Sequence, residues 1–118
     1  MSYNYLDAAF FRGKTITAII QPSDEELFFT ADGKRYQMFH CQDCCEHVRV
    51  THVDGVLTDL IGSPLTVAHE EVNGSEADDG SATETTYTFA TENSTVRIFW
   101  LGTSNGHYSE SVQIQEIE

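Results

Sequence analysis

Apolar and polar residues alternate along much of this chain, in short runs that are separated by turn-forming residues. In residues 46–53, Val48 and Val50 fall on one face of an extended chain, and His47, Arg49 and Thr51 fall on the other. Because a period of two is typical of half-buried strands, the pattern predicts about eight of them. They span residues 14–20, 26–30, 35–41, 46–53, 65–72, 85–91, 95–101 and 108–117.

Turn signals between these runs define the fold class. Asp32-Gly33 predicts a hairpin, because both central residues of a type I′ turn need a positive φ, and Asn105-Gly106 predicts a further turn. Residues 56–61 suit a single helical turn, and the acidic, polar residues 73–82 predict a mobile loop. We therefore expect residues 1–118 to form one mostly β domain, a compact antiparallel sandwich or open barrel with at most one or two short helical turns.

Charge changes the picture of possible partners. The net charge is −13, and residues 50–118 carry twelve acids against one base, Arg97. Phosphate contacts need Lys and Arg, so this balance argues against direct binding to nucleic acid or to an anionic membrane. It favours a basic partner surface or mimicry of nucleic acid, beside the simpler reading of a soluble acidic protein. No apolar run approaches the roughly 20 residues of a membrane span, which predicts a cytoplasmic protein.

All three cysteines lie in one polar stretch, residues 40–47. In the first interpretation this is a tight turn, in which Gln42 and Asp43 supply hydrogen bonds and reduced Cys44 and Cys45 are packed small residues. Gln42, Asp43 and Glu46 could instead rim a polar pocket. A zinc half-site is the third interpretation, with its ligands among His40, Cys41, Cys44 and His47. Structural zinc sites draw a second ligand pair from a distant segment, and the other histidines occur singly, so no metal or cofactor is expected.

Four sequence blocks carry a resemblance to a known family. They are Gly13-Lys14-Thr15-Ile16-Thr17, His40-x-Gln42-Asp43-Cys44-Cys45-Glu46, Asp59-Leu60-Ile61-Gly62-x-Pro64 and Ser104-Asn105-Gly106-x-Tyr108-Ser109-Glu110. The chain resembles, over residues 12–115, a family of small proteins of unknown function found largely in bacteriophage and prophage genomes. The resemblance implies a phage accessory protein that binds and blocks a host component, and it assigns no chemistry to individual residues.

Two arginines on alternating strands suggest where a ligand could bind. Arg49 and Arg97 could share one sheet face, where a fixed guanidinium pair near Phe99 or Tyr87 could hold a phosphate and stack a base. A turn at Asn105 could shape a pocket with its amide group. The alternative is that each arginine pairs with one of the many acids. The candidate ligand-binding residues are Arg49, Arg97, Asn105, Gln42, Asp43, Phe99 and Tyr108.

Three functional hypotheses follow. No nucleophile, base and acid converge in the sequence, so we expect a non-enzymatic binding protein of the anti-defence type, which sequesters a small nucleotide signal in the host cytoplasm. The site could lie at a subunit interface of a homo-oligomer. The first alternative is an acidic protein–protein inhibitor or nucleic-acid mimic that blocks a basic host protein. The second alternative is a small zinc-stabilised domain.

Overall fold

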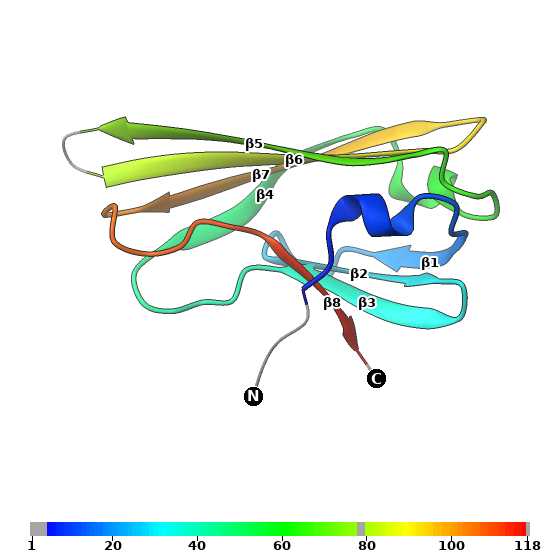
Figure 1. The fold of residues 1–118 in the computed structure, drawn as a ribbon, viewed down its shortest axis with the longest axis horizontal. Helices are drawn as coiled ribbons and strands as arrows, with labels where there is room; N and C mark the ends of the chain where they lie inside the picture. Colours follow the sequence, from blue (N-terminus) through cyan, green and yellow to red (C-terminus); the bar gives the residue numbers. More distant parts are fainter. Residues whose placement is uncertain (1–4, 78–79, 118) are drawn as a thin grey trace.

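The computed structural model describes residues 5–77 and 80–117, which form two antiparallel β-sheets packed face to face (Figure 1). The strand orders are β1-β2-β3-β8 in the smaller sheet and β4-β7-β6-β5 in the larger one. Two short 3₁₀ turns, η1 and η2, are the helical elements of this part of the chain. The predicted fold class, a mostly β antiparallel sandwich with at most two helical turns, is confirmed.

The smaller sheet contains β1 (Ile16–Ile20), β2 (Glu26–Ala31), β3 (Lys34–Phe39) and β8 (Gln113–Ile117). β2 and β3 form the predicted hairpin, and its turn residues Asp32 (φ 50°) and Gly33 (φ 81°) both have the positive φ of a type I′ turn. The Asp32 carboxylate accepts a hydrogen bond from the Thr15 backbone N–H (3.0 Å), so the turn also fixes the start of β1.

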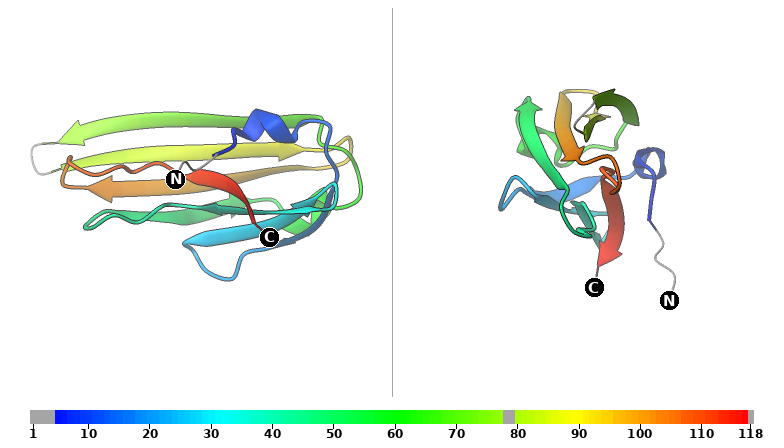
Figure 2. Two further views of the ribbon diagram at one scale, coloured as in Figure 1. Left: turned by 60° about the horizontal axis from the view of Figure 1, so that its bottom comes forward. Right: turned by 90° about the vertical axis from the view of Figure 1, so that its left-hand side faces the viewer.

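The larger sheet contains β4 (His47–Asp54), β5 (Val67–Ala77), β6 (Gly80–Ala90) and β7 (Thr95–Ser104). β6 and β7 meet in a tight turn, in which the Thr91 backbone N–H donates to the Ser94 carbonyl (2.8 Å). β5, β6 and β7 are longer than the alternation predicts. Figure 2 shows that their far ends project beyond the smaller sheet.

The loop predicted over residues 73–82 is instead strand on both sides of its centre. Residues 73–77 belong to β5 and residues 80–82 to β6, paired in register from Asn73 with Glu84 to Ala77 with Gly80. Residues 78–79, also in the predicted loop, lie outside the described residues. β6 is paired with β7 on its other side, so a segment without large apolar side chains is still held by two ladders of backbone hydrogen bonds. The amino-acid composition of residues 73–82 alone does not reveal this backbone pairing.

Two loops carry the chain between the sheets, and we call them the crossover loops: residues 40–46 join β3 to β4, and residues 105–112 join β7 to β8 (Figure 1). They lie against each other, because the His40 ring nitrogen Nδ1 contacts the Ser111 carbonyl (2.6 Å) and the Cys41 N–H donates to the Gln113 side chain (2.8 Å). The last strand therefore begins at Gln113 and pairs with β3, so the turn at Asn105 is not a hairpin.

The core lies between the sheets and is closed on one side by η1 (Ala8–Phe11), which the sequence analysis did not predict. Phe11 is fully buried, with its ring 5.0 Å from Phe29 and 4.8 Å from Tyr36. η2 (Leu57–Leu60) is the predicted helical turn, and it buries Leu60. Within residues 5–77 and 80–117, no helix has the length and apolar character to cross a membrane.

Candidate functional site

The outer face of the larger sheet carries the clearest candidate site. Alternation along β7 places one set of side chains in the core and the other set outside. The inner set is Val96, Ile98 and Trp100; the outer set is Arg97, Phe99 and Leu101. Phe99 is half-buried in the middle of this face, and the predicted candidates Arg97 and Phe99 are therefore brought together on it.

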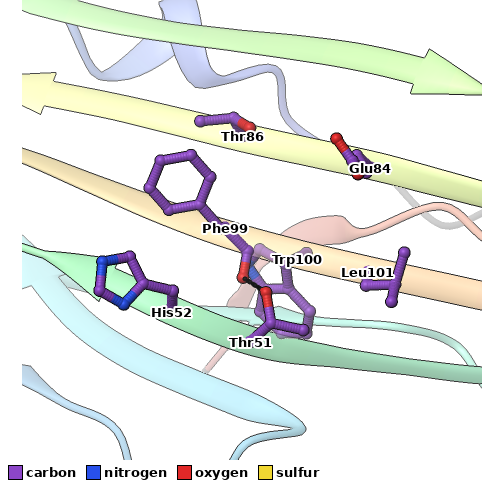
Figure 3. Close-up of a pocket in the computed structure, with 7 residues that line it drawn as sticks. All are labelled: Thr51, His52, Glu84, Thr86, Phe99, Trp100 and Leu101. Atoms are coloured by element: carbon purple, nitrogen blue, oxygen red, sulfur yellow. Dashed lines mark hydrogen bonds between the residues drawn. The ribbon is translucent and has the colours of Figure 1, made fainter.

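A β-bulge in β4 adds a second ring beside Phe99. Val50 pairs with Trp100 and His52 with Phe99, which leaves Thr51 as the extra residue between them. A bulge shifts the alternation by one position, so His52 turns to the same face as Phe99. The centroids of the two rings are 5.7 Å apart (Figure 3). Strict alternation would have put His52 on the opposite side from Arg49.

Two open hollows adjoin at Phe99 and Thr86, which line both of them. The first, of about 280 Å³, is drawn in Figure 3 and is also lined by His52, Glu84 and Leu101. The second, of about 500 Å³, extends toward β5, where His69, Glu71, Thr88 and Arg97 line it. Phe99 thus separates a hollow lined by His52 from a hollow lined by His69 and Arg97.

Both predicted arginines lie on this face and flank Phe99 along the strands. Arg97 is two residues before Phe99, and Arg49 pairs with Leu101, two residues after it. The two positions are about 13 Å apart, at 3.3 Å per residue. Neither guanidinium forms an ion pair with an acid of the described chain, and Arg49 Nη1 lies 3.2 Å from His47 Nδ1. The alternative reading, in which each arginine pairs with an acid, is therefore not found among the residues that the structure describes.

The other predicted residues do not join the arginines. Asn105 is eight residues beyond Arg97 along the same strand direction, about 26 Å away. Its side-chain oxygen accepts a hydrogen bond from the His107 backbone N–H (3.0 Å) and so shapes its own turn. Tyr108 follows in the same crossover loop, and Gln42 and Asp43 lie in the other one. Sheet geometry therefore separates Asn105 from Arg97 within one chain. A ligand that contacts Arg49, Arg97 and Asn105 together would need a second copy of the chain, and this grouping stays a prediction.

Gln42 and Asp43 instead belong to a hydrogen-bond network around Glu46. The Glu46 side chain is fully buried and accepts from Gln42 Nε2 (3.0 Å) and from the backbone N–H groups of Asp43 (3.1 Å) and Cys44 (2.8 Å). Burial acts to raise the pKa of this carboxyl, but hydrogen bonds from the His40 side chain and from backbone N–H groups outweigh it and lower the pKa to about 2.

His40 completes this hydrogen-bond network and connects it to the other crossover loop. Its Nε2 lies 3.0 Å from Glu46 Oε2, and its Nδ1 faces the Ser111 carbonyl. A carbonyl and a carboxylate can only accept, so each of these contacts needs a proton on the ring nitrogen that faces it. The side chains of His40 and Glu46 are 3% and 0% exposed, so the pair is buried, and it is an ion pair when the ring carries both protons.

The contacts of this loop leave the suggested metal ligands unsuited to bind a metal ion together. Both nitrogens of His40 are engaged, and Cys44 forms a disulfide with Cys45, whereas Cys41 is free and exposed. In residues 5–77 and 80–117, no group of three or more His, Cys, Asp or Glu side chains could hold a metal ion. The expectation of reduced, packed Cys44 and Cys45 is also wrong: both are exposed, because the backbone N–H groups of this turn point inward at Glu46.

A second buried carboxylate, Glu110, holds the other crossover loop. It is 7% exposed and accepts hydrogen bonds from the hydroxyls of Ser81, Thr83 (2.7 Å) and Ser104. Burial acts to raise its pKa, and the three hydroxyl hydrogen bonds outweigh this effect and lower it. The sequence blocks at residues 40–46 and 104–110 thus each end in a glutamate that anchors a crossover loop.

Comparison with known families matches residues 11–114 to a domain of unknown function, DUF7448. This chain belongs to the DUF7448 family. No curated protein and no solved structure matches it. The matched range of the DUF7448 domain contains every strand from β1 to β7, both crossover loops and the outer-face site.

Sequence reasoning missed several residues of the outer-face site in this DUF7448 domain. His52 was missed because nothing in the sequence marks the bulge at Thr51. His69, Thr86 and Thr88 were missed because they come from neighbouring strands whose register the sequence does not give. Once Phe99 is taken as an outer-face residue, its cross-strand partner Thr86 follows from the pairing of β6 with β7.

Proposed function

We propose that this DUF7448 protein is a non-enzymatic binding protein that sequesters a small, nucleotide-like anion on the outer face of its larger sheet. The observation that carries the proposal is the half-buried Phe99 between Arg97 and Arg49, neither of which is ion-paired within the described chain. A ligand that binds these guanidinium groups breaks no existing ion pair. Their N–H groups are therefore available for the ligand, which would compete at Arg97 with Asp54, its cross-strand neighbour on the same face.

The two hollows suit the two parts of a nucleotide. A base can stack on Phe99 and His52, since π-faces of every base accept an aromatic partner. A phosphate fits next to Arg97, where Thr88 lines the same hollow and offers a hydroxyl donor. Glu71 and Glu84, at the edges of the hollows, would repel a phosphate but can accept hydrogen bonds from the amino groups of a base. The face therefore favours a ligand with both kinds of group.

The biological setting is the second part of the proposal. The blocks at residues 13–17, 40–46, 59–64 and 104–110 resemble those of small phage proteins that act by binding host components. We infer a phage accessory protein in the host cytoplasm, which removes a nucleotide signal of antiviral defence by binding it. No bond is made or broken in this role, so the arginines and the aromatic pair are the whole of the required machinery.

Thermal-shift measurement with cyclic dinucleotides, cyclic trinucleotides and cyclic ADP-ribose isomers tests the proposal. At least one of these ligands should raise the unfolding midpoint of the wild-type protein by more than about 2 °C, since a ligand that binds only the folded state stabilises it. Arg97→Met and Phe99→Leu should each abolish the shift.

Matched controls come from the smaller sheet, where Arg35 is exposed and Phe28 is half-buried on its outer face. Arg35→Met and Phe28→Leu should leave the ligand-induced shift unchanged. Absence of a shift with every ligand would overturn the proposal. An equal loss in the control variants would show that the outer face of the larger sheet is not the site.

A further inference from the structure

Within the described residues, the larger sheet ends in a long strand that has a neighbouring strand on one side only. β5 pairs with β6 in unbroken register from Val67 with Ala90 to Ala77 with Gly80, and it is the last strand of its sheet in the described chain. In an antiparallel pair, every second residue directs its backbone N–H and C=O away from the partner. β5 therefore presents a row of backbone donors and acceptors that a further strand could use.

Only the first part of this edge is covered. η1 packs against β5, and the Ala8 backbone N–H donates to Glu70 Oε1 (2.9 Å). In Figures 1 and 2, η1 lies beside the first half of β5, and the second half projects with β6 beyond the smaller sheet. Every side chain of residues 71–76 is exposed, including Val72 at 57%. We call residues 71–76 the free edge.

The free edge lacks most of the features that protect edge strands. Proteins block such strands with charged side chains, proline or a bulge; β5 contains no lysine, proline or bulge, and its charged side chains are all carboxylates, which oppose pairing with an acidic strand and not with a basic one. It carries Glu70, Glu71 and Glu76 and no Lys or Arg, and Glu84 lies on the adjacent strand opposite Asn73. Two copies paired through this edge would bring these acids together, so self-pairing is opposed by charge.

We infer that the free edge is a docking site for an extended, lysine- or arginine-containing segment of another protein, which adds to the sheet as a fifth strand next to β5. Main-chain hydrogen bonds hold the incoming segment to β5. The side chains that alternate along that segment determine which segments bind. Glu71 and Glu76 lie on opposite faces of β5, so basic side chains on both faces of the incoming strand find a carboxylate. Val72 offers an apolar contact between them. This surface is distinct from the nucleotide-binding face, although Glu71 borders both.

The probe is a synthetic peptide of about eight residues with a repeating Lys-Lys-Val-Val pattern, which places lysines on both faces of an extended strand. Its binding to the full chain is measured by isothermal titration calorimetry and mapped by amide chemical shifts. Perturbed amides should centre on residues 71–76. The same peptide with N-methyl groups on alternate residues cannot complete the backbone ladder, and it should bind at least about tenfold more weakly. The charge contribution is tested with Glu71→Gln/Glu76→Gln, which should weaken binding by about tenfold.

Control variants separate this inference from the other possibilities. Glu25→Gln/Glu92→Gln removes the same charge from exposed positions elsewhere and should leave affinity unchanged. Phe99→Leu, which should abolish the nucleotide-induced shift without changing any charge, should also leave peptide affinity unchanged, so failure of the nucleotide site and failure of the free edge are distinguishable. Equal binding of the N-methylated peptide would overturn the inference, since charge attraction alone would then suffice. Amide shifts that appear with increasing protein concentration in the absence of peptide would also overturn it, in favour of a second copy of this chain.

Discussion

Glu46 shows how one residue can organise a loop that the sequence presents as a cysteine cluster. Its carboxylate accepts hydrogen bonds from His40, Gln42 and two backbone N–H groups. The side chains of Glu46 and His40 are buried, whereas the three cysteines are exposed. A buried ion pair with this many hydrogen bonds has its charges compensated, and removal of one partner leaves the other uncompensated. Residues 40–46 therefore serve mainly to hold the two crossover loops together. The cysteine side chains take no part in this hydrogen-bond network.

We expect Glu46 to make stability depend on pH in the acid range. Its pKa is about 2 in the folded protein against an ordinary value of 4.5, so its contribution is fully present above about pH 4.5 and is lost as the pH falls toward about 2. Glu46→Gln places an amide donor against His40 and should lower the unfolding midpoint at pH 7. The difference between wild type and variant should shrink as the pH falls from about 4.5 to about 2 in urea titrations.

Glu26 provides the matched control for this substitution. It is half-buried and accepts one side-chain hydrogen bond, from Gln37 Nε2 (2.9 Å), which a glutamine oxygen can still accept. Glu26→Gln should therefore have a smaller effect at pH 7 than Glu46→Gln. A constant difference between wild type and Glu46→Gln across the acid range would show that the Glu46 charge contributes nothing to folding.

At the scale of elements, β7 connects the core, the outer-face site and a crossover loop. Its inner side chains fill the core, its outer side chains include Arg97 and Phe99, and Gly102 lies directly beneath the loop that Glu110 anchors. A Cβ at Gly102 would lie 2.6 Å from the Glu110 carbonyl oxygen and 2.8 Å from Glu110 Cβ. The loop approaches the strand this closely because glycine leaves the space open.

Gly102→Ala should therefore destabilise the protein by about 1–3 kcal/mol, the usual cost of overpacking a filled site. Gly74 on β5 is the control, since a Cβ there would meet only Thr83 Oγ1, at 3.9 Å. Gly74→Ala should be neutral or stabilising by up to about 1 kcal/mol, because alanine loses less backbone entropy in a strand. Urea unfolding of the three proteins decides the point. Similar losses for both variants would mean that strand propensity, and not contact with the loop, sets the effect.

Across the whole molecule, local signals predicted the strands, and long-range pairing decided the rest. The hairpin at Asp32-Gly33 and the alternation in β7 are encoded by adjacent residues, and both were predicted correctly. The bulge that turns His52 toward Phe99 depends on the register between β4 and β7, which no short segment contains. The same holds for β5 beyond Val72, whose polar residues are strand only because β6 pairs with them. The candidate site was therefore predicted in part, as Arg97, Phe99 and Arg49, without its flanking residues.

Charge is a property of the whole chain, and it gives a prediction at that scale. The net charge is −13, and the described chain has two ion pairs, Lys34–Glu116 and the buried His40–Glu46. Most acids therefore repel one another without compensation, over distances that salt can screen. Raising NaCl from about 10 mM to about 150 mM shortens the Debye length from about 30 Å to about 8 Å and should raise the unfolding midpoint.

The increase should depend on where the acids are concentrated. β5 and β6 carry four glutamates and no Lys or Arg, so replacing the three exposed ones, Glu71, Glu76 and Glu84, by glutamine should reduce the salt-induced increase in the midpoint. Replacing three acids of the first half of the chain, where five bases offset seven acids, should reduce it less. Suitable positions for that comparison are Asp24, Glu25 and Asp43, all of which are exposed. A midpoint that falls as salt is added would mean that attraction between charges outweighs repulsion, because salt screens surface ion pairs and leaves the buried His40–Glu46 pair largely unaffected.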